Sequence, residues 1–83
     1  MTTKEQLKRR IVGRLNKLRR DIKQLIDDKE SWNDNRPEKQ PFDVGYDKTL
    51  LYYVDKQLEA WTNDDPQEAT RWSKKMESIV RHA

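Results

Sequence analysis

The stretch LKRRIVGRLNKLRRDIKQLI, residues 7–26, combines eight Lys and Arg residues with eight Leu, Ile and Val residues and contains a single acid, Asp21. Its apolar residues follow the alternating spacing of four and three that marks one face of a helix. They are Ile11, Leu15, Leu18, Ile22 and Leu25, continued by Trp32 and widened by Val12 and Ile26. The pattern predicts one long helix, from about Lys4 to about Trp32, with a seam like that of a coiled coil.

Both ends of this helix carry recognisable signals. Thr3 is placed to cap the N-terminus, and Gln6 follows at the spacing of a capping box. Lys8 and Lys29 stand at the two ends of the apolar seam. At a rise of about 1.5 Å per residue, the helix would be roughly 40 Å long.

The remainder of the chain predicts a loop and two shorter helices. Residues 33–46 contain Pro37 and Pro41 and read as a loop, in which Phe42 and Val44 are expected to pack against the helices. A second helix is predicted over about 47–62, with Leu51, Val54, Leu58 and Trp61 on its apolar face. A third is predicted over about 66–82, with Ala69, Trp72, Met76, Ile79 and Ala83 on its apolar face.

The start of the third helix is strongly marked. Asp65 suits the N-cap, Pro66 the first helical position, and Glu68 the first turn. We therefore expect one all-α domain over residues 1–83, in which a long N-terminal helix packs antiparallel with a C-terminal two-helix hairpin. The two shorter helices cannot cover the first along its whole length, so part of the long helix either projects or pairs with a second copy in a dimer.

Composition argues against several classes of function. The 83 residues include no Cys, and charged residues make up 40% of the chain against 33% hydrophobic residues. No apolar run approaches the roughly 20 residues that span a membrane, and the N-terminus has no apolar leader segment, so a cytoplasmic protein is expected. No nucleophile–base pair, metal-ligand set or phosphate-binding loop is evident, and His82 is the only histidine. We expect a protein that is not an enzyme, with no cofactor and no small-molecule substrate.

The charge is concentrated at the front of the chain. Residues 1–25 hold nine Lys and Arg residues against Glu5 and Asp21, whereas residues 26–83 hold nine basic and thirteen acidic residues. On a helical wheel, one basic stripe falls opposite the apolar face. It consists of Arg9, Arg10, Gly13, Lys17 and Arg20. Arg and Lys at these positions suit phosphate oxygens, and the glycine would let a phosphate backbone approach closely. The first hypothesis is a nucleic-acid-associated regulator.

Three other interpretations of the basic stripe stay open. It is also typical of an ordinary solvated helix face, of a surface that docks on an acidic protein, and of a helix lying at a lipid interface. All seven aromatic residues lie outside the basic stretch, so no basic and aromatic stacking platform is visible there. Tyr52 and Tyr53 lie off the apolar face of the second helix and are candidates for binding a protein. The second hypothesis is therefore a small inhibitor or adaptor, analogous in size and composition to phage and plasmid accessory proteins.

Overall fold

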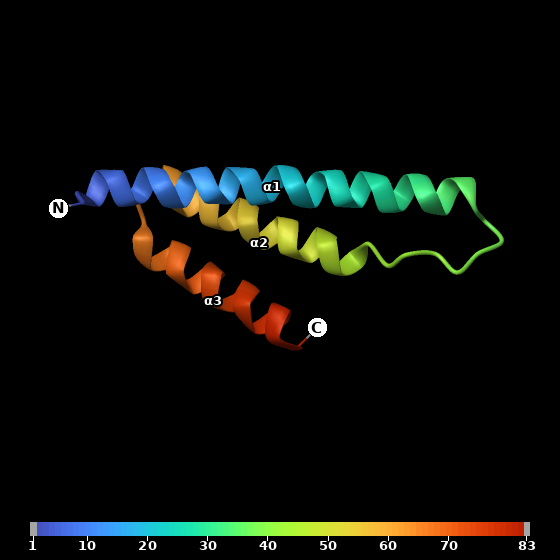
Figure 1. The fold of residues 1–83 in the computed structure, drawn as a ribbon. Coiled ribbons are helices and arrows are strands. Elements are labelled where there is room, and N and C mark those ends of the chain that lie inside the picture. The colour runs from blue at the N-terminus through green and yellow to red at the C-terminus, as the bar shows by residue number, and fades with distance from the viewer. Residues whose placement is uncertain (1, 83) are drawn as a thin grey trace.

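The computed structural model describes residues 2–82, except for the side chain of His82. Ala83, which was predicted on the apolar face of the third helix, lies outside the described residues. The described residues form α1 (Lys4–Asn35), α2 (Gly45–Thr62) and α3 (Pro66–His82), with no strand among them. The molecule measures 55 × 21 × 21 Å, and α2 returns antiparallel along α1 before α3 folds back along α2 (Figure 1). This confirms the all-α class, with a long N-terminal helix followed by a two-helix hairpin.

The first helix begins as predicted and continues past Trp32 to Asn35. The Thr3 hydroxyl accepts from the Gln6 amide at 3.1 Å, and the Gln6 side chain accepts from the Thr3 amide at 3.0 Å, so the capping box is confirmed. At the other end, the Asn33 side-chain amide donates to the Phe42 carbonyl at 3.1 Å and accepts from the Phe42 amide at 2.8 Å. The Phe42 ring meets Trp32 edge-on at 4.9 Å, yet 50% of Phe42 stays exposed. The loop is thus tied to the end of α1 without being buried.

A tight turn joins α2 to α3. The Asp65 carboxylate accepts from the Glu68 amide at 3.1 Å, which confirms Asp65 as the cap of α3. Asp64 does not cap α3 but follows the end of α2. Its φ of 54° lies in the left-handed region. The Asp64 and Asp65 amides donate back to Trp61 and Ala60 of α2, in the pattern of a Schellman motif.

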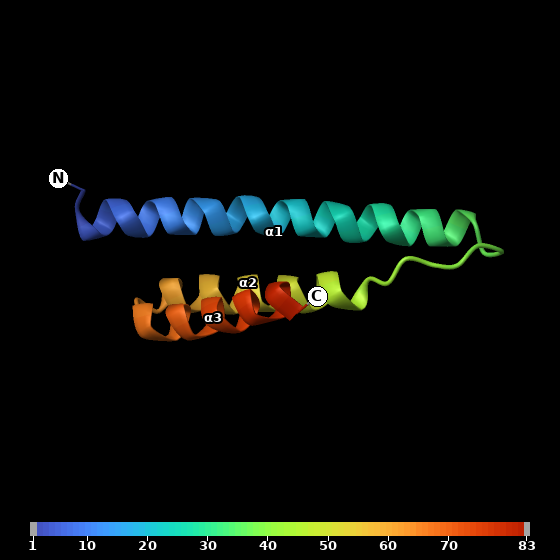
Figure 2. The same cartoon turned by 60° about the horizontal axis from the view of Figure 1, so that its bottom comes forward.

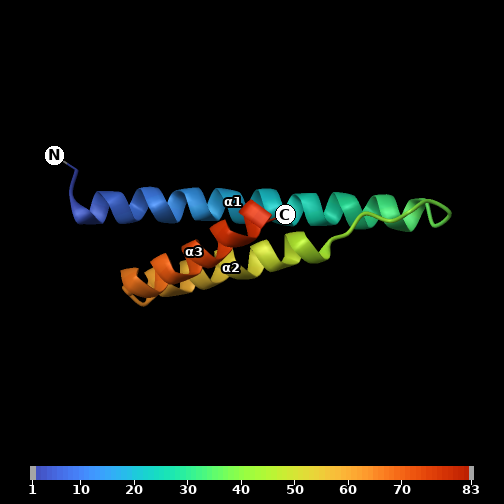
Figure 3. The same cartoon turned by 90° about the horizontal axis from the view of Figure 1, so that it is seen from below.

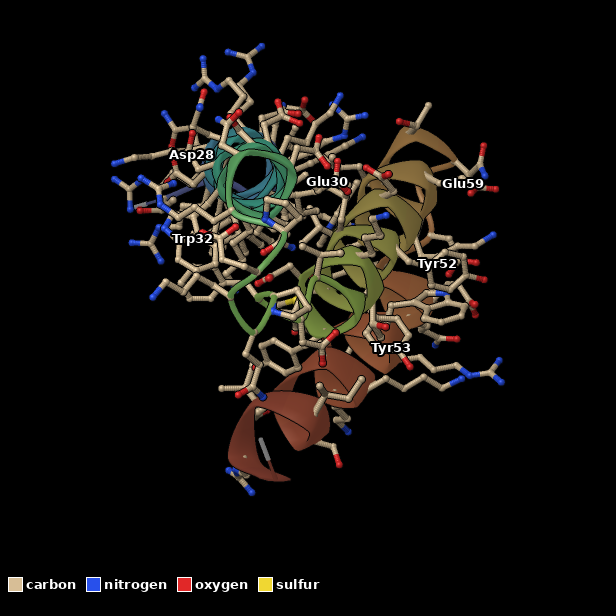
Figure 4. The ribbon with its side chains drawn as sticks, turned by 90° about the vertical axis from the view of Figure 1, so that its right-hand side faces the viewer. Asp28, Glu30, Trp32, Tyr52, Tyr53 and Glu59 are labelled. Atoms are coloured by element: carbon tan, nitrogen blue, oxygen red, sulfur yellow. The ribbon has the colours of Figure 1, made fainter. Side chains whose placement is uncertain are left out.

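The three helices form an open array with α2 in the middle. α2 packs against both α1 and α3, whereas no Cα atom of α1 lies within 8 Å of a Cα atom of α3 within residues 2–82. The end-on view shows the three helices arranged in this order (Figure 4), and the turned view shows α2 and α3 together on one side of α1 (Figure 2). α3 diverges from α2 toward its C-terminus (Figure 3). One side of α1 is therefore covered, and the rest of its surface is not.

The face of α1 that packs against α2 is rotated about the helix axis relative to the predicted seam. Leu15, Ile22 and Ile26 are buried with Val54 of α2, and Val54 has no exposed surface at all. The α1 positions on this side recur at alternating steps of four and three, and all of them are buried or half-buried. They are Lys8, Val12, Leu15, Arg19, Ile22, Ile26 and Lys29, here called the α1–α2 seam. The prediction that Ile11, Leu18 and Leu25 belong to the packed seam is wrong, because they are 37%, 38% and 44% exposed.

Every charged residue of the α1–α2 seam meets an acid of the returning chain. Lys8 lies 3.5 Å from Asp64, Arg19 2.6 Å from Asp55, and Lys29 2.6 Å from Asp47. The Asp47 residue is only 4% exposed, and the Lys29 side chain is 24% exposed. A buried carboxylate is costly unless it is paired with a cation. The packing of α2 on α1 therefore depends most on the ion pair between Lys29 and Asp47.

We expect Lys29→Met to lower the free energy of unfolding by about 3 kcal/mol, because it leaves the buried Asp47 carboxylate without its cation. Combining it with Asp47→Leu should recover most of that loss, since an apolar pair removes the uncompensated charge. Arg19→Ala is the control: its ion pair is more exposed, and its loss should cost less than about 1 kcal/mol. Urea denaturation measures all three, and equal losses in Lys29→Met and Arg19→Ala would contradict the assignment.

Candidate nucleic-acid interface

The predicted basic residues lie on the side of α1 that faces away from α2. Arg9, Arg10, Gly13, Lys17 and Arg20 are all exposed. Because the α1–α2 seam occupies alternate steps of four and three along the opposite side, these positions project outward from the molecule. Seen along the axis of α1, nitrogen-tipped side chains fan out from the side turned away from α2 (Figure 4).

Most of these cations are not neutralised by the protein itself. Arg9 lies 4.0 Å from Glu5 one helical turn away, and both side chains are well exposed. No carboxylate among the described side chains pairs with Arg10, Lys17 or Arg20. An exposed pair at the limit of contact contributes little, so Arg9 also keeps its charge available.

Two further cations flank this surface, one on each edge, and the predicted basic stripe did not include them. Arg14 and Lys23 are exposed and have no ion-pair partner among the described side chains. Arg14 was left out because the predicted seam was centred too close to Leu18, which placed Arg14 at its margin. The shift of the seam toward Arg19 moves Arg14 outward, whereas Lys23 lies on the edge next to α2, beside Ile26 and Leu51. Together these cations form the outer basic face, which consists of Arg9, Arg10, Arg14, Lys17, Arg20 and Lys23.

The glycine in this face is not required by the fold. A methyl group built on Gly13 would have no neighbouring atom within 4 Å, and the backbone there is not left-handed. Space above the helix backbone is therefore open at the centre of the outer basic face. A glycine that weakens a helix without relieving a clash is the expected choice where another backbone must come close.

The two tyrosines lie elsewhere. Tyr52, Tyr53 and Trp72 form an aromatic cluster between α2 and α3, with ring centroids 5.6 to 5.8 Å apart. Tyr52 remains 51% exposed, whereas Tyr53 is half-buried. Lys56 and Lys75 lie over the Tyr52 and Trp72 rings at 5.5 and 4.4 Å. Figure 4 shows both tyrosines on the far side of α2 from α1, so they share no surface with the outer basic face.

The described residues hold no cluster of His, Asp and Glu side chains that suits a metal ion. None of the helices among them has the length and apolar character to cross a membrane. Comparisons with protein-family models, curated proteins and solved structures give no significant match to this chain. The outer basic face must therefore be interpreted from its own chemistry.

We expect Gly13→Ala to raise the free energy of unfolding by about 0.5–1 kcal/mol, because alanine loses less backbone freedom in a helix and meets no neighbour here. Urea denaturation followed by circular dichroism measures the change. Leu15→Ala should lower stability by about 2–5 kcal/mol, because it opens a cavity in the packed seam. A Gly13→Ala variant that is less stable than the parent would show that the space above Gly13 is occupied.

Proposed function

We propose that the protein binds the phosphate backbone of nucleic acid through the outer basic face of α1. The observation that carries this proposal is a band of six exposed cations around the uncovered side of α1, five of them without a carboxylate partner among the described side chains. Arg and Lys contacts to phosphate supply affinity without reading sequence.

The dimensions of the face suit a duplex. Arg9 and Lys23 are fourteen residues apart, which at about 1.5 Å per residue spans roughly 21 Å along α1. A helix with its side chains is about 10–12 Å wide, close to the width of about 12 Å of the major groove of B-form DNA. The open position at Gly13 lies within this span and would leave the helix backbone accessible to a phosphate.

The alternative function is docking of the same face on an acidic protein, with Tyr52 as an additional contact. The exposure of Tyr52 supports a protein contact at the aromatic cluster, but that cluster and the outer basic face lie on different sides of the molecule. One flat partner cannot cover both. Phosphate binding needs only the outer basic face and is therefore the simpler assignment.

Binding to duplex DNA or RNA of random sequence should depend steeply on salt. Six phosphate contacts correspond to a slope of about −5 in log affinity against log salt, or a loss of about a thousandfold between about 50 and 200 mM. A variant with Arg9, Arg10, Lys17 and Arg20 all changed to Ala should reduce the slope to about −2. Fluorescence anisotropy at several salt concentrations gives both slopes.

A matched variant separates this face from net charge alone. Changing Lys48, Arg71, Lys74 and Arg81 to Ala removes the same charge from exposed positions on α2 and α3. It should leave the salt slope within about one unit of the parent, since it removes no contact of the outer basic face. Equal loss in the two variants, or no binding by the parent near physiological salt, would overturn the proposal. Binding of the parent to acidic proteins but not to duplexes would favour the alternative.

A further inference from the structure

A second uncovered surface runs along α1 beside the outer basic face. Leu7, Ile11, Leu18 and Leu25 are 48%, 37%, 38% and 44% exposed and lie in one line at spacings of four and seven. They are called here the apolar stripe. Single exposed apolar residues are common, but an aligned row on one helix is the pattern of a helix–helix contact. Among the described residues, Trp61 and Pro66 lie beside Leu7 and Ile11 at the N-terminal end of this row, and no helix packs along the rest of it.

We propose that the apolar stripe is the contact surface of an antiparallel homodimer, in which Leu18 of the two copies meets at the two-fold axis. In a two-fold contact the same surface is used by both copies, so the stripe must complement itself. With Leu18 on the axis, Ile11 of one copy faces Leu25 of the other, because both lie seven residues from it. Each apolar residue from Ile11 to Leu25 then has an apolar partner.

The charges along the stripe select the antiparallel direction. Arg14 and Asp21 lie on the same edge of the stripe, are exposed, and have no ion-pair partner among the described side chains. Arg14 lies four residues before Leu18, and Asp21 lies three residues after it. The antiparallel register therefore brings Arg14 of each copy beside Asp21 of the other. A parallel register would put this edge of the two copies on opposite sides of the contact, so Arg14 of one copy could not reach Asp21 of the other.

The charge of the whole helix gives the same direction. Residues 4–20 carry eight basic residues and one acid, whereas residues 21–35 carry two basic residues and five acids. Antiparallel copies set the basic half of one α1 against the acidic half of the other. Parallel copies would align the two basic halves, and that repulsion disfavours the parallel form.

A groove at the N-terminal end of the stripe supplies a third point of fit. Leu7 and Ile11 line it together with Trp61 and Pro66 from the other side. In the proposed register, Trp32 of the second copy, with Phe42 stacked on its edge, arrives opposite Lys4 at the mouth of this groove. The half-exposed Phe42 ring would then be covered by the partner.

Cysteine crosslinking tests the register directly, because the chain has no cysteine of its own. The full chain is used, without nucleic acid, with a short bis-maleimide. Leu18→Cys should crosslink to itself, and a mixture of Ile11→Cys and Leu25→Cys should give the mixed dimer. Ile11→Cys alone and Leu25→Cys alone should stay uncrosslinked. Self-crosslinking of both single variants would mean a parallel dimer and overturn the proposal.

A charge exchange tests the pairing without introduced thiols. Arg14→Glu and Asp21→Arg should each weaken the dimer by roughly tenfold or more in sedimentation equilibrium, since each creates two like-charge contacts. The combined Arg14→Glu, Asp21→Arg variant should regain the parental dissociation constant. Helix content by circular dichroism confirms that each variant stays folded.

A parent chain that sediments as a monomer at every concentration would overturn the proposal, and so would failure of the combined exchange to restore association. Either result would assign the apolar stripe to some other occupant. In the dimer Arg14 pairs with Asp21 of the other copy, and the outer basic face keeps its five other cations. Since these measurements contain no nucleic acid, their failure leaves the assignment of that face unaffected.

Discussion

The packing of α2 against α1 is the contact on which the rest of the structure depends, because α2 alone among the described helices touches both of the others. Its centre is Val54, which has no exposed surface and lies against Leu15, Ile22 and Ile26 of α1. α2 also meets α3, where the Tyr53 ring lies 5.6 Å from that of Trp72 and the Gln57 side-chain amide donates to the Met76 sulfur at 3.7 Å. Only six apolar residues are buried among those described, so this core is thin for its length.

One-sided packing divides the surface of α1 into three strips with different chemistry. The strip toward α2 is apolar and closed by ion pairs, the next is apolar and open, and the outermost is cationic and open. A closed three-helix bundle would have buried the middle strip against α3. The missing α1–α3 contact therefore leaves both uncovered strips available to partners. A ligand on either strip would also stabilise the fold, because it would bind only the folded helix.

The sequence was sufficient for features that depend on neighbouring residues. Thr3 with Gln6 and Asp65 with Pro66 bond or lie within one turn, so their caps could be predicted from spacing alone. The long helix and the exposure of Arg10 and Lys17 followed from the same short-range periodicity. The rotation of the apolar seam did not, since α1 carries two overlapping rows of apolar residues. Choosing the row with more Leu and Ile selected Leu18 and Leu25, and it also left Arg14 out of the basic face.

What decides between the two rows is long-range electrostatics. The row that meets α2 contains Lys8, Arg19 and Lys29. Because these residues are charged, a count of apolar residues favours the other row. Their partners are Asp64, Asp55 and Asp47, in reverse order along the returning chain. The three cations are eleven and ten residues apart along α1, and their partners are nine and eight residues apart along the returning chain. Such similar spacings are expected of two antiparallel helices packed in one fixed register. Matching cations on one helix to acids on the next in reverse order would have identified the packed row, because a charged position with a partner need not face water.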